Sequence, residues 1–249
     1  MHPVLFQIKS LTLYSYGFFI ALAMAVCFFL VRRLAPGRGL DADAAGDLVF
    51  LMFVGGIIGA RAWFVWQRWP EYQDNVWQAF NLRGGGLVWD GGFLAAVTLG
   101  LVYAYARKWP ALKFCDFFSP IAALAHGLGR LGCFMNGCCY GKTSESFLAV
   151  RFPGEETARL PTQLFEALFL FVFSGFLFWL WSKGLRQGRV FAAYLFLYGA
   201  GRFALEFLRG DQSAFYFLTL PQWVSLLLMA AALFIFRITR RRSSSDAKF

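Results

Sequence analysis

Seven long apolar runs, separated by short polar segments, dominate the pattern along this chain. They cover residues 13–31, 48–66, 87–106, 117–134, 161–181, 190–208 and 220–236. A bilayer core accommodates about 20 apolar residues per helix, and in lipid each backbone polar group must bond within its own segment. The pattern therefore predicts an all-α integral membrane protein with seven transmembrane helices, built as a single transmembrane domain over residues 1–249.

Composition supports the membrane assignment. Hydrophobic residues make up 59% of the 249 residues and charged residues only 15%, whereas soluble proteins have about 45–50% and 25%. Seven spans of this length use most of the chain, so a separate soluble domain does not fit.

Basic residues are distributed unevenly between the two sets of alternate loops. Fourteen of the 24 lie on one side and seven on the other. Because lysine and arginine favour the cytoplasmic side, we expect a periplasmic amino terminus and a cytoplasmic carboxyl terminus. The basic tail after the last run serves as a topology anchor beside anionic lipid headgroups, so the net charge of +10 does not indicate nucleic-acid binding.

Three arginines lie inside the apolar runs: Arg61, Arg130 and Arg202. An arginine at mid-helix costs at least about 2.5–3.5 kcal/mol to insert and usually faces a cavity or a partner. The alternative is a structural ion pair with a buried carboxylate. For Arg202 that alternative has a partner in sequence, because Glu206 lies one helical turn on.

Arg130 differs because no acidic residue falls within one turn of it. On a helix, His126, Arg130 and Cys133 line one stripe, and the glycines around them leave room for a ligand. Guanidinium binds phosphate bidentately, so this segment predicts a phosphate-bearing ligand at Arg130.

Asp90 enters the third run with no basic neighbour in sequence. Desolvation there would raise the pKa of its carboxyl, which suits a general base, while a helix N-cap is the alternative. The five cysteines include Cys133, Cys138 and Cys139, whose spacing matches no standard zinc pattern. We therefore expect no metal site and no cofactor, and interpret these cysteines as small wall residues, with a disulfide left open.

With these residues in view, the chain resembles the prolipoprotein diacylglyceryl transferase family of bacterial inner membranes. The matching segments run in order along nearly the whole chain: residues 16–17, 59–61, 129–132, 136–137, 140–141, 161–166, 198–199, 202, 206–209 and 222. Each match alone is weak, but together they are specific.

The resemblance implies a seven-helix, multi-pass enzyme of the bacterial inner (cytoplasmic) membrane with an outward-facing active site. Its partners would be phosphatidylglycerol, prolipoprotein substrates and membrane lipids. Members transfer the diacylglyceryl group of phosphatidylglycerol to the lipobox cysteine thiol, and glycerol phosphate leaves. The expected phospholipid-binding residues are Tyr16, Arg61, Arg130, Asn136, Gly141, Arg202 and Glu206. The expected catalytic residues are Asp90, His126, Arg130 and Arg202.

The chain also departs from the family pattern. Asp90 replaces an expected histidine, Cys133 a signature asparagine and Cys138 an acidic residue, while His126 stands where an apolar residue is usual. We hypothesise that Asp90 or His126 abstracts the proton of the acceptor thiol. Three alternatives stay open: a diverged member that uses a phospholipid donor with another acceptor, an anion or lipid transporter, and a thiol-oxidising membrane protein.

Overall fold

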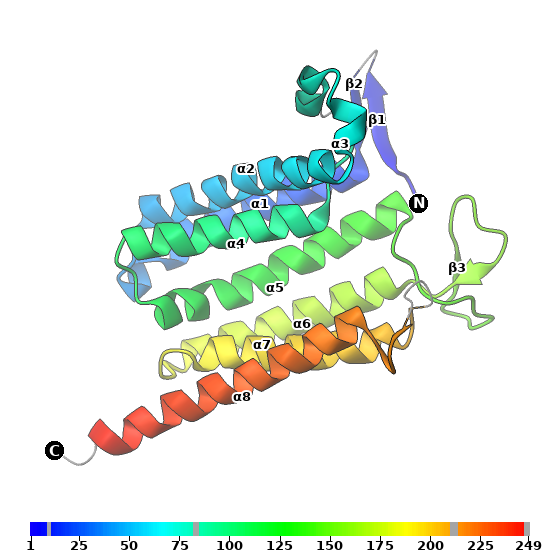
Figure 1. The fold of residues 1–249 in the computed structure, drawn as a ribbon. Helices are drawn as coiled ribbons and strands as arrows, with labels where there is room; N and C mark the ends of the chain where they lie inside the picture. Colours follow the sequence, from blue (N-terminus) through cyan, green and yellow to red (C-terminus); the bar gives the residue numbers. More distant parts are fainter. Residues whose placement is uncertain (9–10, 82–84, 210–213, 247–249) are drawn as a thin grey trace. The chain divides into compact units, whose positions relative to one another are not determined.

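Seven long helices form the framework of the protein in a computed structural model, which describes residues 1–8, 11–81, 85–209 and 214–246. These helices are α1 (Ser15–Leu34), α2 (Ala42–Gln67), α4 (Trp89–Ala106), α5 (Ala111–Asn136), α6 (Thr162–Ser182), α7 (Arg189–Glu206) and α8 (Leu220–Asp246) (Figure 1). Each overlaps one of the seven predicted apolar runs. The protein is therefore mostly helical, as the hydrophobic pattern predicts.

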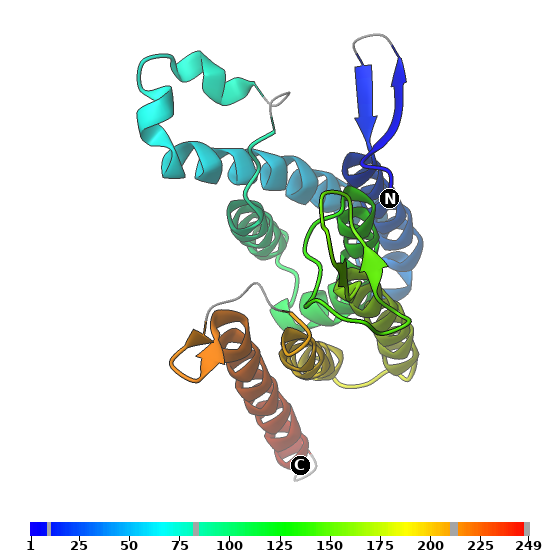
Figure 2. The same cartoon turned by 90° about the vertical axis from the view of Figure 1, so that its right-hand side faces the viewer.

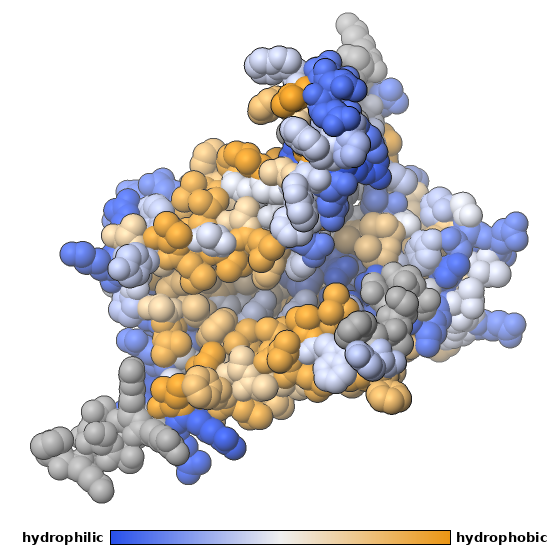
Figure 3. Space-filling view, viewed as in Figure 1, coloured by the Kyte–Doolittle hydropathy of each residue, from blue (hydrophilic) through white to orange (hydrophobic). Residues whose placement is uncertain are grey.

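Four of the helices are long and apolar enough to cross a membrane: α1, α2, α6 and residues Leu220–Arg240 of α8. Hydrophobic side chains gather over the middle of the helices in Figure 3, whereas hydrophilic side chains gather near helix ends. Many large apolar side chains on these helices are exposed, among them Phe29, Ile58 and Leu168. Apolar surface of this kind needs an apolar solvent, so the chain is a multi-pass membrane protein.

Short elements connect the long helices. They are the 3-10 helices η1 (Pro36–Arg38) and η2 (Val76–Phe80), the short helix α3 (Trp69–Tyr72), and three antiparallel hairpins. The hairpins pair β1 (Val4–Ile8) with β2 (Leu11–Tyr14), β3 (Val150–Arg151) with β4 (Ala158–Arg159), and β5 (Ala214–Phe215) with β6 (Leu218–Thr219). Figure 2 shows β1 and β2 extending from the start of α1. The all-α prediction omitted these hairpins.

The chain forms two compact units. Residues Val26–Ala111 make one unit, and residues Met1–Ala25 with Leu112–Phe249 make the other. In the Val26–Ala111 unit, α2 packs on α4 through glycines. A Cβ on Gly59 would lie 2.6 Å from the carbonyl oxygen of Gly91, and a Cβ on Gly91 would lie 2.5 Å from that of Gly59. This close approach is the packing role of small residues in membrane helices.

In the other unit, a carboxylate near the start of α5 caps α7. The amides of Gly188 and Phe191 donate to the Asp116 carboxylate at 2.6 and 2.7 Å, and Asp116 is buried. A negative charge at a helix N-terminus satisfies unpaired N–H groups and the helix dipole. Further along α5, the hydroxyl of Ser174 in α6 donates to the Pro120 carbonyl at 2.8 Å. These contacts align α5, α6 and α7.

Candidate functional site

A carboxylate from α6 meets two polar side chains of α5. Arg130 Nε lies 3.0 Å from Glu166 Oε2, and His126 Nε2 lies 3.7 Å from Glu166 Oε1. His126 and Arg130 are four residues apart and so share a helix face. Glu166 lies little more than one turn after Pro161, the N-cap residue of α6. The expectation that Arg130 has no acidic partner is therefore wrong: the partner comes from another helix, which local sequence spacing does not reveal.

A second ion pair lies at the end of α7. Arg202 Nη1 is 2.7 Å from Glu206 Oε2, as the spacing of one helical turn allows. Glu206 Oε1 also accepts a hydrogen bond of 3.0 Å from the Thr219 hydroxyl, and the Thr219 amide donates to Gln222 Oε1 at 3.0 Å. The start of α8 is thus tied to this pair.

The two ion pairs belong to one electrostatic neighbourhood. His126 interacts electrostatically with Arg130, Arg202 and Glu166, and so does Tyr198 of α7, whose ring centre is 5.6 Å from that of His126. These two pairs hold two arginines and two glutamates, which balance in charge. We name the group His126, Arg130, Glu166, Arg202 and Glu206 the arginine–carboxylate cluster.

Several atoms of the arginine–carboxylate cluster are buried without an aligned hydrogen-bond partner. Among the side chains that the structure describes, seven such buried atoms occur, and five lie in or beside this cluster. They are Arg130 Nε, Glu166 Oε1, Arg202 Nη1, Glu206 Oε2 and, beside the cluster, Gln163 Oε1. The ion pairs are close in distance but poorly aligned. Buried polar atoms are rarely left in this state, and a polar ligand that enters the cluster would satisfy them.

Arg61 has a different environment, within the Val26–Ala111 unit. Its five N–H donors bond to five backbone carbonyl oxygens of the segment after α2, and Nη2 also lies 3.5 Å from the Tyr72 hydroxyl. The acceptors are Ala79, Gly85, Gly86, Gln78 and Asn81, at 2.6–3.2 Å. A guanidinium has five donors, so none is left for a lipid phosphate. The geometry favours a role in shaping this segment over the predicted role in phospholipid binding.

Asp90 is the second residue of α4, and its side chain is exposed. The N-cap residue is Val88, so Asp90 is not the cap, although a carboxylate in the first turn interacts favourably with the helix dipole. The Val26–Ala111 unit, to which Asp90 belongs, does not bury its side chain, so the expected desolvation of the carboxyl is not found within that unit. A role as a base therefore rests on the sequence resemblance alone.

The three other predicted lipid-binding residues lie around the end of α5. Tyr16 of α1 packs against Gly132 and interacts electrostatically with Arg130, and Asn136 is the exposed last residue of α5. Gly141 is buried, and a Cβ there would lie 2.6 Å from the Leu208 carbonyl oxygen. Gly141 thus allows a close approach of two backbone segments, which is a packing role.

The loop between α5 and α6 is fixed by its own polar contacts. Tyr140 donates to Glu155, and Arg159 Nε donates to the same carboxylate at 2.6 Å. These two hydrogen bonds hold the pKa of Glu155 below its usual value. The Gln163 amide donates to the Cys138 carbonyl at 2.6 Å and the Thr162 hydroxyl to that of Cys139 at 3.1 Å, so the loop is anchored to α6.

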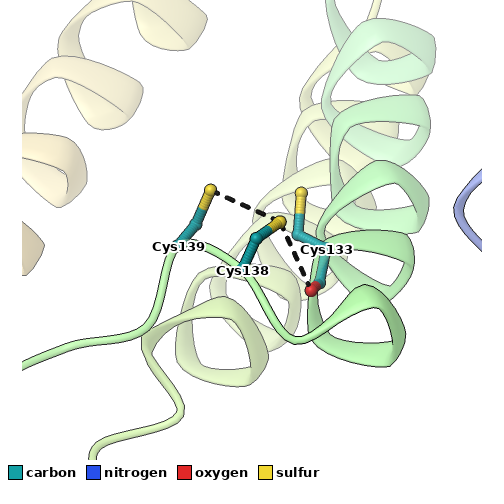
Figure 4. Close-up of side chains that lie close together, drawn as sticks. All are labelled: Cys133, Cys138 and Cys139. Carbon is teal, nitrogen blue, oxygen red and sulfur yellow. Dashed lines mark hydrogen bonds between the residues drawn. The ribbon is translucent and has the colours of Figure 1, made fainter. Parts of the chain in front are cut away.

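Three thiols gather where this loop leaves α5. The sulfur atoms of Cys133, Cys138 and Cys139 all lie within 4.8 Å of one another (Figure 4). Hydrogen bonds from Cys133 and Cys138, followed by the charges of Arg130 and Arg209, lower the pKa of the Cys139 thiol. The sequence spacing did not indicate that these three cysteines would meet, and the structure brings them into one group.

Sequence reasoning missed Glu166, Gln163 and Tyr198 as site residues. Glu166 is 4% exposed and Gln163 is 1% exposed, both on the first turns of α6. A buried carboxylate early in an apolar run was the available signal, since such a group needs a partner. Its partner was not readable from sequence because it lies on another helix.

These features define a class: a helical membrane protein with a buried arginine–carboxylate cluster at the ends of its helices. Residues 3–238 match the prolipoprotein diacylglyceryl transferase family. The chain therefore belongs to this family.

Curated relatives cover nearly the full length of the chain. A phosphatidylglycerol–prolipoprotein diacylglyceryl transferase of Clostridium tetani is 34% identical over 97% of this chain and 99% of the relative. A second relative with the same name, from Streptococcus pyogenes serotype M5, is 31% identical over 97% of this chain and 96% of its own length. A third relative, phosphatidylglycerol–prolipoprotein diacylglyceryl transferase 2 of Clostridium perfringens, is 29% identical over 99% of this chain and 98% of its own length.

Proposed function

We propose that this chain transfers the diacylglyceryl group of phosphatidylglycerol to the acceptor cysteine thiol of prolipoproteins. The relatives that match it over nearly their whole length are named for this donor and this acceptor. In the reaction a carbon–sulfur bond forms at the glyceryl carbon, the carbon–oxygen bond to phosphate breaks, and glycerol phosphate leaves. The acceptor thiol gives its proton to a base.

The observation that carries the proposal is the arginine–carboxylate cluster with its unaligned buried atoms. Departure of glycerol phosphate develops negative charge, which Arg130 and Arg202 can stabilise. Glu166 and Glu206 keep the two guanidinium groups neutralised before the lipid enters. Because their contacts are poorly aligned, a phosphate can compete for the same donors at a lower cost than it could against ideal pairs.

The lipid site we propose comprises Tyr16, Arg130, Asn136, Arg202 and Glu206. Gly141 is assigned to packing, and Arg61 to shaping the segment that follows α2. Arg130 and Arg202 act as catalytic cations. His126 is 25% exposed and in reach of Glu166, which supports it as the proton acceptor, and Asp90 is the alternative from sequence. Loss of turnover in His126→Ala with activity retained in Asp90→Asn would assign the base to His126, and unchanged rates in both would refute both assignments.

We further propose that the chain is a single transmembrane domain with seven spans in the bacterial inner membrane. The amino terminus is periplasmic and the carboxyl terminus cytoplasmic. Support comes from the excess of lysine and arginine in alternate loops. Reporter fusions after residues 36, 74, 109, 148, 186 and 216 should alternate in location, and any two successive fusions on the same side would contradict this topology.

Incubation of the purified protein with phosphatidylglycerol and a lipobox peptide tests the activity directly. Mass spectrometry should detect a diacylglyceryl adduct on the peptide thiol and released glycerol phosphate. A peptide with serine in place of cysteine is the control and should remain unmodified. Absence of the adduct with folded protein would overturn the proposed function.

A further inference from the structure

The three clustered thiols have the dimensions of a metal site. A zinc ion with Zn–S bonds of about 2.3 Å places its sulfur ligands about 3.8 Å apart in a tetrahedron. Cys138 Sγ and Cys139 Sγ are 3.7 Å apart, and all three sulfurs lie within 4.8 Å of one another. Small rotations about the Cα–Cβ bonds would therefore complete a three-sulfur ligand set.

The backbone explains how an irregular spacing produces this geometry. Helix α5 ends at Asn136, and Gly137 (φ +74°) and Cys139 (φ +64°) then take left-handed conformations that turn the chain back. The Cys138 amide donates to the Cys133 carbonyl at 3.1 Å, which closes this turn. Figure 4 shows the three side chains converging from α5 and the loop that follows it.

The turn is held from outside as well. Gln163 and Thr162 of α6 donate to the carbonyl oxygens of Cys138 and Cys139. The ligand positions are thus fixed by groups outside the thiol cluster, as preorganised metal sites require.

Charge near the thiols is complementary to a metal–thiolate group. Three thiolates with one divalent ion carry a net charge of −1. Arg130 and Arg209 both interact electrostatically with Cys139, so positive charge is already in place. Soft thiolate ligands prefer zinc and copper(I) to hard cations such as magnesium and calcium.

The number of ligands suggests what the site does. Among the described residues, no histidine, aspartate, glutamate or fourth cysteine joins this ligand group. Structural zinc sites have four protein ligands, whereas catalytic sites have three and keep one position open. A cluster of three next to Arg130 resembles the second kind.

We propose that Cys133, Cys138 and Cys139 bind one zinc ion whose fourth position accepts the thiol of the acceptor cysteine. The second half of this statement rests on the proposed function. Coordination favours the thiolate, so the thiol's proton passes to the base considered above. The zinc-held thiolate then attacks the glyceryl carbon as glycerol phosphate departs, and the thioether product, a weaker ligand, dissociates.

Metal binding can be measured without any activity assay. The full-length protein in detergent, stripped and reloaded with Co²⁺, should bind one ion per chain and show the sulfur-to-metal charge-transfer absorption of three thiolates. Cys139→Ser should lose about a third of that absorption and bind more weakly. Cys115→Ser, which changes a cysteine of α5 outside the cluster, should match the unchanged protein.

The wild-type protein supplies a test that needs no variant. Zn²⁺ should protect three cysteines per chain from maleimide, and peptide mapping should place them at residues 133, 138 and 139. Addition of a lipobox peptide should shift the visible Co²⁺ spectrum, while the serine peptide should not.

Several results would overturn the proposal. No Co²⁺ binding above that of Cys139→Ser would refute the metal site, and so would a disulfide among the three cysteines in protein purified under reducing conditions. A spectrum unchanged by the cysteine peptide would refute the open thiol position. Failure of the proposed function looks different: the metal binds, the spectrum responds to thiol, and no diacylglyceryl adduct forms.

Discussion

Arginines shielded from solvent occur in two contrasting environments in this protein: Arg61 is buried, and Arg130 and Arg202 are partly buried. Arg61 directs all its donors at backbone carbonyl oxygens of one segment. Arg130 and Arg202 lie against carboxylates, yet the donor atom of each pair, Arg130 Nε or Arg202 Nη1, lacks an aligned hydrogen-bond acceptor. A guanidinium with every donor satisfied holds the fold together, whereas one in a balanced but misaligned pair is available to a ligand. Burial alone therefore does not identify a functional arginine in a membrane helix.

The largest effect is expected at the misaligned pairs. Arg130→Gln and Arg202→Gln should each lower diacylglyceryl transfer by about 10²–10³-fold, because a group that stabilises developing charge is lost. Lysine at either position should restore only part of the rate, since an ammonium does not bind phosphate bidentately. Adduct formation, followed by mass spectrometry on protein of normal helix content, is the measurement. Rates close to those of the unchanged protein would remove Arg130 and Arg202 from the mechanism.

Arg61→Gln should affect stability rather than chemistry. Hydrogen bonds from a charged donor contribute about 1.5–3 kcal/mol each, so losing the set should lower the free energy of unfolding by about 3 kcal/mol or more. Thermal melting in detergent and proteolysis within residues 68–88 would report this loss. The fraction that stays folded should keep most of its turnover. Normal melting with abolished turnover would show that Arg61 acts in the reaction and not in holding the fold.

Glu166→Gln tests the carboxylate that lies against Arg130 and His126. The variant keeps the shape of the side chain but removes the charge that positions Arg130 and His126. Misplacement of catalytic groups costs up to about 10²-fold in rate, so transfer should fall by up to that factor. Glu145→Gln, which changes an exposed acid in the loop after α5, is the matched control. Equal rates in the two variants would show that Glu166 has no positioning role.

Substitutions at two glycines near the arginine–carboxylate cluster distinguish a role in helix packing from a role in lipid binding. Gly141→Ala should lower the free energy of unfolding by about 1–3 kcal/mol, because overpacking forces backbone shifts and the new Cβ would lie 2.6 Å from the Leu208 oxygen. Gly129→Ala is the control, since its Cβ would meet only a side-chain carbon of Ile20 at 4.0 Å. If Gly141→Ala melts normally but weakens lipid binding, Gly141 contacts the lipid.

The smallest effect concerns pH and the α5–α6 loop. Because the pKa of Glu155 is lowered in the folded protein, its contribution to stability is present above the unfolded pKa of about 4.3 and is lost as pH falls through the folded pKa. Hydrogen exchange should show protection of residues 142–160 falling with acid in the unchanged protein. In Glu155→Gln the protection should be weaker at neutral pH and nearly constant. A steep acid transition in the variant would assign it to another group.

The lengths of the apolar runs were sufficient to locate all seven long helices, because each run exceeds the length at which a strand is plausible. They did not reveal the hairpins, which are as short as two paired residues. Residues one turn apart, such as Arg202 and Glu206, were paired from spacing alone. The partner of Arg130 and the meeting of Cys133 with Cys138 and Cys139 depend on contacts between helices and on a left-handed turn, and neither leaves a periodic signal.

Asp116 has a consequence for how the helices can separate. From the second turn of α5 it accepts two short hydrogen bonds from the start of α7. Arg130 lies fourteen residues further along α5, or about 20 Å away at 1.5 Å per residue. Prying the helices apart at the Asp116 end would expose a buried carboxylate and two amides together. At the far end the Arg130–Glu166 and Arg202–Glu206 ion pairs are already imperfect, so separating the helices beside these pairs costs less, and a lipid would find the easier entrance there.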